Sequence, residues 1–214
     1  MKGTENPYQD LNPLSTGMPL EMARAAMLML HGRGGTAQGI LSLAEALQRP
    51  GFTYLAPQAA DNSWYPFSFL EPLEKNRLWI DSSLKAVGEL IERVEAQGIP
   101  ADKLIILGFS QGACMGLEYA ARRGSRFGGV VGLSGGLIGP PGTVYSYSGT
   151  LEGTPLFLGC SENDPHIPRA RLEETADVFE SLGAQVTFRL YPGVDHGVNR
   201  DEIDFIGRMM TALI

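Results

Sequence analysis

The decisive stretch of this sequence is Gly108-Phe109-Ser110-Gln111-Gly112. Residues 103–107 before it, which are apolar after Lys103, predict a buried strand, and residues 113–121 after it predict a helix. A serine between glycines on a strand-to-helix turn is typical of a nucleophile elbow, in which the small residues let strand and helix pass close together. We therefore expect the Ser110 hydroxyl to be exposed at the N-terminus of a helix.

Such a pentapeptide can also be an ordinary glycine-rich turn. Its assignment as a nucleophile elbow therefore requires the residues that would act together with the serine. A serine nucleophile needs a general base and an orienting acid, which follow an elbow in the order serine, acid, histidine. The chain has three histidines. His31 precedes the serine, and His166 lies only two residues after the best acid. His196 comes soon after the strand predicted at residues 185–190, so it is the candidate base.

The orienting acid should likewise follow a strand. Residues 155–160 predict one, and the loop after it contains Glu162 and Asp164. Asp164 is our candidate acid, and Glu162 remains the alternative.

Backbone N–H groups are expected to face the oxyanion that forms during acyl transfer. One donor is Gln111, directly after the nucleophile, and the other comes from the loop after the first parallel strand. That strand is predicted at residues 25–30 and runs into the glycine-rich residues 31–35, where Arg33 is the candidate donor. A glycine-rich turn can also cradle phosphate, but neither nucleotide-binding glycine motif occurs here.

Four motifs together resemble one known family. They are Leu30-His31-Gly32-Arg33-Gly34, Gly108-Phe109-Ser110-Gln111-Gly112, Asp164-Pro165-His166-Ile167-Pro168 and Tyr191-Pro192-Gly193-Val194-Asp195-His196. In this order they resemble the phospholipase/carboxylesterase family of α/β-hydrolases, which includes small bacterial carboxylesterases and acyl-protein thioesterases. The resemblance covers roughly residues 25–214 and is looser at residues 61–81. It implies a triad of Ser110, Asp164 and His196 and an oxyanion hole at Arg33 and Gln111.

Apolar runs alternate with helical patterns from residue 25 onward, which predicts parallel strands joined by crossover helices. Strands are expected at 25–30, 52–56, 103–107, 129–134, 155–160 and 185–190, and helices near 36–47, 74–97, 111–123, 169–182 and 200–213. The predicted fold class is α/β, an α/β-hydrolase fold with a mostly parallel central sheet, helices on both faces and no large cap domain. We expect one domain over residues 1–214, in which residues 1–24 form an extension or an antiparallel edge strand.

Two connections are longer than usual, at residues 57–73 and 135–154. Both should emerge at the carboxyl ends of the strands, where open α/β sheets bind ligands, so we expect them to form pocket walls. The candidate substrate-binding residues are Trp64, Tyr65, Phe67 and His166. In the alternative, these aromatic side chains only pin the loops onto the core.

The length, charge and residue composition of the chain limit the kinds of partner that it is expected to bind. The 214 residues suffice for one large core, and the formal net charge of −7 disfavours nucleic acid and anionic membranes. The N-terminal residues lack a signal-peptide pattern and no apolar run is long enough to span a membrane, so we expect a cytoplasmic protein. Cys114 and Cys160 are expected to be reduced packing residues, and no metal-ligand spacing occurs, so no metal and no cofactor are predicted.

The sequence therefore predicts a serine carboxylesterase that hydrolyses small to medium esters through an acyl-enzyme intermediate. Within the same chemistry, the alternatives are a lysophospholipase and an acyl-protein or acyl-CoA thioesterase. A dienelactone-type hydrolase is less favoured, since that reaction usually goes with a cysteine nucleophile. A catalytically silent binding protein is the alternative from another class. The expected partner is a small-molecule ester, and a homodimer stays open.

Overall fold

The computed structural model describes residues 12–193 and 195–214. In this part of the chain, one seven-stranded sheet has the order β1-β3-β2-β4-β5-β6-β7. β1 pairs antiparallel with β3, and the other neighbours are parallel. The strands are β1 Leu14–Gly17, β2 Ala25–Leu30, β3 Phe52–Ala56, β4 Leu104–Phe109, β5 Gly129–Leu133, β6 Pro155–Ser161 and β7 Gln185–Tyr191.

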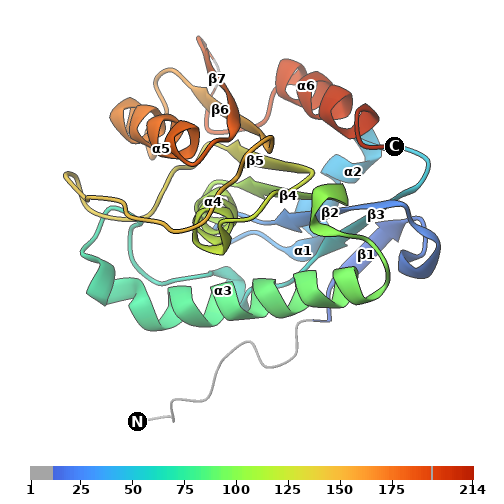
Figure 1. Ribbon diagram of the computed structural model, residues 1–214. Coiled ribbons are helices and arrows are strands. Elements are labelled where there is room, and N and C mark those ends of the chain that lie inside the picture. Colours follow the sequence, from blue (N-terminus) through green and yellow to red (C-terminus); the bar gives the residue numbers. More distant parts are fainter. Residues whose placement is uncertain (1–11, 194) are drawn as a thin grey trace.

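Helices cover both faces of this sheet (Figure 1). α3, α4 and α5 pack on one face, and α1, α2 and α6 pack on the other. The helices are α1 Ala37–Leu41, α2 Leu43–Ala46, α3 Leu73–Ala96, α4 Gln111–Arg123, α5 Arg169–Ser181 and α6 Arg200–Thr211. The expected α/β architecture is confirmed, and within the described residues no connection between strands holds a second domain.

Two details differ from the expected elements. The helix expected near residues 36–47 is divided at Ser42, whose backbone N–H bonds the Gly39 carbonyl three residues back. The sheet has one strand more than the six predicted, because residues 14–17 add β1 at its edge. The antiparallel edge strand proposed for the N-terminal segment is thus present, while residues 1–11 of that segment lie outside the described residues.

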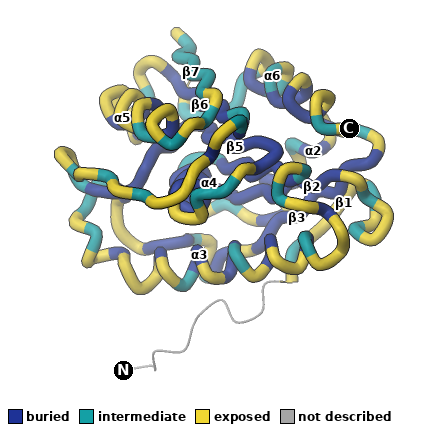
Figure 2. The backbone as a smooth tube through the Cα atoms, viewed as in Figure 1, coloured by how far each residue is buried: buried dark blue, intermediate teal, exposed yellow. Residues whose placement is uncertain are grey.

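The core lies on both sides of the central strands, which are buried along their whole length (Figure 2). In β2, Leu28 packs into the core under α3 and α4, while Met27 and Met29 pack into the core under α1 and α6. A parallel strand covered on both faces has no polar side, so it reads as a continuous apolar run. The parallel pairing of β4, β5, β6 and β7 places the carboxyl ends of these strands at one edge of the sheet.

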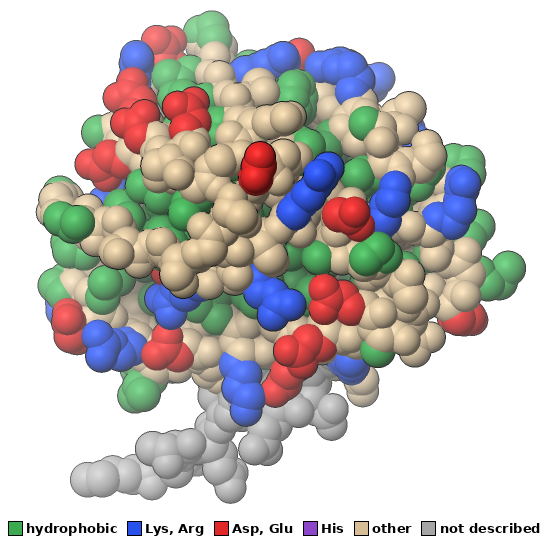
Figure 3. Space-filling model, in the orientation of Figure 1, with side chains coloured by type: hydrophobic (Ala, Val, Ile, Leu, Met, Phe, Trp, Pro, Cys, Tyr) green, Lys and Arg blue, Asp and Glu red, His purple; other side chains and the backbone are tan. Residues whose placement is uncertain are grey.

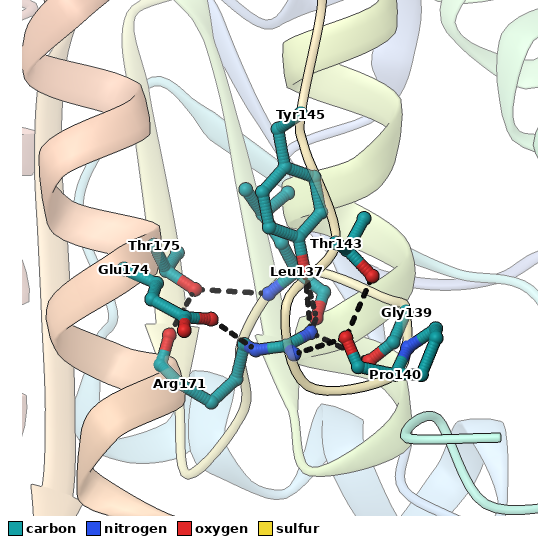
Figure 4. A network of polar contacts seen from close by, with 8 residues as sticks. All are labelled: Leu137, Gly139, Pro140, Thr143, Tyr145, Arg171, Glu174 and Thr175. Carbon is teal, nitrogen blue, oxygen red and sulfur yellow. Dashed lines mark hydrogen bonds and ion pairs between the residues drawn. The ribbon is translucent and has the colours of Figure 1, made fainter.

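The long connection after β5 is held by a buried arginine of α5 (Figure 4). The Arg171 side chain is 3% exposed and donates to the carbonyl oxygens of Leu137, Gly139 and Pro140 at 2.8, 2.8 and 3.1 Å. It also contacts the Tyr145 hydroxyl. A buried guanidinium that satisfies several carbonyls fixes a loop which has no regular hydrogen-bonding ladder of its own.

Replacing Arg171 by methionine should destabilise the protein by about 1–3 kcal/mol, because the Gly139 carbonyl loses its donor while the Leu137 and Pro140 carbonyls keep only the bonds from Tyr145 and Thr143. Urea denaturation measures this change. Arg169→Met is the matched control, since Arg169 is exposed on the same helix and pairs only with Glu173. Its effect should stay within about 0.5 kcal/mol. Equal destabilisation by the two variants would contradict the anchoring role of Arg171.

Candidate active site

The turn between β4 and α4 holds Ser110 in a strained backbone conformation. Its φ is 54° and its ψ is −120°, values that a residue with a side chain rarely adopts. The Ser110 N–H donates to the Leu133 carbonyl at 2.8 Å, and its own carbonyl accepts from Cys114 N–H at 3.1 Å. Such strain costs on the order of 1–3 kcal/mol, and it persists here because both neighbouring elements are fixed.

The two glycines of the turn are required by close backbone approach. A Cβ on Gly108 would lie 2.3 Å from the Gly112 carbonyl oxygen, and a Cβ on Gly112 would lie 2.1 Å from the Leu30 carbonyl oxygen. Neither backbone oxygen can move aside without displacing a buried strand or helix. The spacing of these glycines around Ser110 therefore reflects the packing of α4 against β2 and β4.

Ser110, His196 and Asp164 form one chain of hydrogen bonds. The Ser110 Oγ lies 2.9 Å from His196 Nε2, and His196 Nδ1 lies 2.7 Å from Asp164 Oδ2. The Asp164 side chain is fully buried, whereas that of His196 is 19% exposed. The three residues follow β4, β6 and β7, so the carboxyl ends of the strands bring together side chains that are up to 86 residues apart in the sequence.

The environment of Asp164 keeps its carboxylate charged. Burial by itself raises the pKa of Asp164, but the hydrogen bonds from His196 and from the backbone N–H of His166 outweigh it and hold this pKa below its ordinary value. The other oxygen, Oδ1, accepts the N–H groups of His166 and Ile167 at 2.8 and 3.1 Å. A charged carboxylate only accepts hydrogen bonds, so the ring proton of His196 lies on Nδ1 and Nε2 is free to accept from Ser110.

The alternative acid, Glu162, lies elsewhere. Its side chain is exposed, and its backbone N–H donates to the Tyr191 carbonyl at 3.0 Å. His31 is also outside the hydrogen-bonded chain. Its Nε2 accepts from Ala59 N–H at 3.1 Å while Nδ1 lies 2.8 Å from the Gly32 carbonyl, and burial lowers its pKa. His31 therefore serves as a neutral structural residue of the loop after β2.

That loop lies directly against the serine. A Cβ on Gly32 would be 3.3 Å from Ser110 Cβ, which places the neighbouring Arg33 backbone beside the elbow. Gln111 is the first residue of α4, and its side chain is used to hold the connection after β3. It accepts from Trp64 N–H at 2.9 Å and donates to the Tyr65 carbonyl at 2.7 Å. The side chain of Gln111 is thus occupied, and only its backbone faces the nucleophile turn.

A cavity of about 590 Å³ opens beside the serine. Both Ser110 and His196 line it, as do three of the four predicted substrate-binding residues, Tyr65, Phe67 and His166. The His166 ring meets the His196 ring edge-on at a centroid distance of 4.9 Å. Pro66, Ser68 and Phe69 also line it, and they belong to the connection at residues 57–73 that was expected to form a wall. Sequence reasoning did not assign Cys114 and Ile167 to the pocket.

Trp64, the fourth predicted substrate-binding residue, does not line the cavity. Its side chain is fully buried, and its indole Nε1 donates to the His31 carbonyl at 2.8 Å. Trp64 therefore joins the connection after β3 to the loop after β2. For this residue the alternative reading, in which an aromatic side chain pins the loop, is correct.

The expectation that residues 135–154 form a pocket wall is also wrong. None of the described lining residues comes from that segment. Instead, the Gly139 N–H donates to the Phe69 carbonyl at 2.9 Å. The segment held by Arg171 thus supports the wall residue Phe69 from behind.

Cys114 could have been placed in the wall from its spacing. It follows Ser110 by four residues on the same helix, and such residues share one face. Burial raises the pKa of its thiol to about 11, so the group is a protonated, apolar part of the wall. Ile167 carries no comparable sequence signal, because the loop after β6 has no periodic pattern.

Comparisons with known proteins identify the family of this chain. The model of the phospholipase/carboxylesterase family matches residues 15–214. The chain belongs to the phospholipase/carboxylesterase family. It is therefore a member of a hydrolase family, and its architecture is the α/β-hydrolase fold without a large cap domain.

Individual relatives extend this finding. The chain is 40% identical to a phospholipase/carboxylesterase from Dyadobacter fermentans of known crystal structure, with a TM-score of 0.90 over 94% of this chain and 97% of that one. It is 29% identical to acyl-protein thioesterase 1 of Debaryomyces hansenii, over 85% of this chain and 88% of the relative. It is 26% identical to acyl-protein thioesterase 1 of Neurospora crassa, over 87% and 86%.

The described residues contain no group of three or more histidine, cysteine, aspartate or glutamate side chains arranged to hold a metal ion. No helix among them combines the length and the apolar character that crossing a membrane requires.

A second buried carboxyl group lies close to the site. Glu202 forms a capping box at the start of α6, where its Oε2 accepts from Asn199 N–H at 2.8 Å. Its side chain packs against β6 so closely that a Cβ on Gly159 would lie 2.2 Å from Oε1. Glu202 is 1% exposed, and Oε1 has no hydrogen-bond partner among the described residues. Burial raises the pKa of Glu202 to about 7.

The raised pKa of Glu202 should make folding stability depend on pH. The folded protein holds this proton more tightly than the unfolded chain, whose glutamate has the ordinary pKa of 4.5. The contribution of Glu202 to stability is therefore complete below pH 4.5 and is lost as the pH rises to about 7. In Glu202→Gln this loss should be absent. The difference in unfolding free energy between the variant and wild type should therefore shift by about 2–3 kcal/mol in favour of the variant between pH 4.5 and pH 8.

Denaturant titrations at a series of pH values measure this difference. Glu45→Gln is the control, since Glu45 is exposed on α2 and its replacement should leave the pH profile unchanged. Parallel pH profiles for wild type and Glu202→Gln would show that Glu202 is ionised in the folded protein like an ordinary surface carboxylate.

Proposed function

We propose that this protein is a serine hydrolase of carboxylic esters, with Ser110 as nucleophile, His196 as general base and Asp164 as the acid that orients it. The observation that carries the proposal is the hydrogen-bonded chain of these three side chains at the wall of the cavity. A strained serine, a histidine in the matching tautomer and a buried carboxylate are the parts that acyl transfer needs.

The reaction begins when a bound ester carbonyl lies next to the Ser110 hydroxyl. His196 Nε2 takes the hydroxyl proton as the oxygen attacks, and Asp164 stabilises the imidazolium that forms. The backbone N–H groups of Gln111 and Arg33 donate to the oxygen that becomes negative in the tetrahedral intermediate. Both groups belong to segments that flank Ser110, so they are in place before substrate arrives.

Three further proton transfers complete the cycle. His196 returns the proton to the departing alcohol, which leaves the acyl group esterified to Ser110. Water then enters, His196 removes one of its protons, and the acid is released as Ser110 regains its hydrogen. No cofactor takes part in these steps, and a cytoplasmic location belongs to the same proposal.

The cavity supports small to medium acyl groups as substrates. Tyr65 and Phe69 are 2% and 8% exposed, so their rings form fixed walls that limit the length of an acyl chain. Behind Phe69, the Gly139 N–H holds the backbone of this wall in place. A rigid wall rejects longer chains more strongly than a mobile one because it cannot repack around the added methylenes.

Thioester hydrolysis is the second candidate, and the curated relatives favour it. Two of them, at 29% and 26% identity, are acyl-protein thioesterases. The same Ser110 attack and the same oxyanion donors serve a thioester, whose leaving thiolate is a better leaving group than an alkoxide. Acyl-chain length separates the candidates, because removal of a long acyl group from a protein requires a wall that lets the chain pass.

Replacing Ser110 by alanine should lower kcat/KM for a chromogenic ester on the order of 10⁴-fold or more, since the attacking oxygen is lost. Hydrolysis is followed by alcohol release, and circular dichroism checks that the fold is intact. The matched control is Ser68→Ala, because Ser68 lines the same cavity. Its activity should stay within about threefold of wild type, since no step uses its hydroxyl. An equal loss in both variants would assign the effect to the cavity wall.

A series of p-nitrophenyl esters from acetate to palmitate, with thioesters of the same acyl groups, tests the substrate class. For esters, kcat/KM should rise about fourfold per methylene and then fall once the chain meets the wall. Phe69→Leu should shift this optimum toward longer chains, and Val144→Ala, 90% exposed and outside the wall, should not. A steady rise to palmitoyl substrates, with thioesters preferred, would favour the thioesterase.

A further inference from the structure

The cavity wall carries positive charge in a protein that is acidic overall. The chain has a formal net charge of −7, and Figure 3 shows side chains of both signs on the face in view, with acids gathered over α5. Among the described residues, no aspartate or glutamate lines the cavity, whereas Arg33 does. Asp164 is fully buried behind His196 and is neutralised in part by its hydrogen bonds. Among the described residues that line the cavity, a ligand therefore meets a guanidinium and no carboxylate.

The Arg33 guanidinium is held in a fixed position. It donates to the carbonyl oxygens of Pro66 and Phe67 at 2.8 and 2.7 Å and to the Ser63 Oγ at 3.2 Å. It also lies over the Tyr65 ring, 5.7 Å from the centroid. These neutral partners orient the group but leave its charge uncompensated, because a carbonyl contributes only a partial negative charge. The charge is thus placed before any ligand binds.

The uncompensated charge of Arg33 differs from the paired charges of other arginines in the chain. Several form ion pairs with aspartate or glutamate: Arg122, Arg123, Arg169, Arg171, Arg189 and Arg200. Within residues 12–193 and 195–214, no carboxylate forms an ion pair with Arg33. Glu71, in the same connection after β3, pairs with Lys75 at 3.0 Å.

We infer that Arg33 selects esters that carry a negative charge close to the scissile bond, such as monoesters of dicarboxylic acids. This inference rests on the proposed function, since it names the substrate class of the same site. The Arg33 backbone lies beside Ser110, and its side chain lines the same cavity, so a carboxylate a few bonds from the ester carbonyl can reach the guanidinium. A fixed positive charge a few ångströms away should favour the anionic ester by about tenfold over a neutral one of the same shape.

The experiment compares monomethyl glutarate with methyl valerate, which have similar size and differ in one charge. Hydrolysis is followed by acid release in a pH-stat, and the ratio of the two kcat/KM values is the readout. Wild type should prefer the glutarate ester, Arg33→Gln should lose most of this preference, and Arg33→Lys should keep it. Arg208→Gln is the charge-matched control, since Arg208 is exposed on α6 outside the cavity, and it should leave the ratio unchanged.

Salt gives an independent check of the electrostatic origin. The preference of wild type should shrink between about 20 mM and about 500 mM sodium chloride, because screening weakens the attraction to a partly exposed charge. If Arg33→Gln lowers the hydrolysis of both esters equally and the ratio persists, Arg33 only holds the loop at residues 63–67, and the inference is overturned. A wild-type ratio of one overturns it as well.

A binding measurement tests the charge selection by Arg33 separately from the proposed hydrolase function. In Ser110→Ala, calorimetric titration should show the glutarate ester binding about tenfold more tightly than the valerate ester, and this difference should vanish when Arg33→Gln is added. Equal binding with rapid hydrolysis of neutral esters by wild type would overturn only the charge selection. Tighter binding of the anionic ester with no hydrolysis by wild type would support the selection and overturn the proposed function.

Discussion

The close packing of α4 against β2 and β4 is the constraint on which the rest of the structure depends. The Leu30 carbonyl and the turn after β4 approach so closely that Gly108 and Gly112 have no space for a side chain. The residue between them must reverse the chain within one step, and Ser110 does so at a positive φ. The strain is local, and the burial of both neighbouring elements outweighs it. An exposed hydroxyl at the head of a buried helix is the direct result.

The same packing decides what surrounds that hydroxyl. Because β2, β4, β6 and β7 are parallel members of one sheet, the loops after them all emerge at one edge. His196 and Asp164 are far from Ser110 in sequence, yet strand register alone brings their loops within hydrogen-bond distance. The capping box of Asn199 and Glu202 then fixes where α6 begins, four residues after His196. Buried backbone geometry thus does the long-range positioning, and short side-chain contacts complete it.

The sequence predicted the parts of this site that depend on chain order and strand ends. Ser110 and Asp164 follow β4 and β6, which read as apolar runs because they are buried on both faces, and His196 follows the half-buried edge strand β7, in which Val186, Phe188 and Leu190 alternate with polar residues. The prediction that Trp64 lines the pocket was wrong for a physical reason. An aromatic residue in a long loop can face the ligand or the core, and its orientation depends on the partner of its indole N–H. That partner, the His31 carbonyl, comes from a different segment. The segment at residues 135–154 was misplaced likewise, since Arg171 holds it from a helix that follows it in the chain.

The connection after β3 joins these observations, because both residues proposed as oxyanion donors hold it through their side chains. Gln111 bonds the backbone of Trp64 and Tyr65, and Arg33 bonds the carbonyls of Pro66 and Phe67. The backbone N–H groups of the two residues therefore remain available for chemistry while their side chains shape the pocket wall. The side chains of Gln111 and Arg33 thus constrain the position of the pocket wall relative to Ser110. A change in the wall would therefore also shift the backbone N–H groups of these two residues. In the proposed function, substrate selection and stabilisation of the oxyanion would then be coupled through the same two residues, and Arg33 would supply a charge for recognition without a separate binding element.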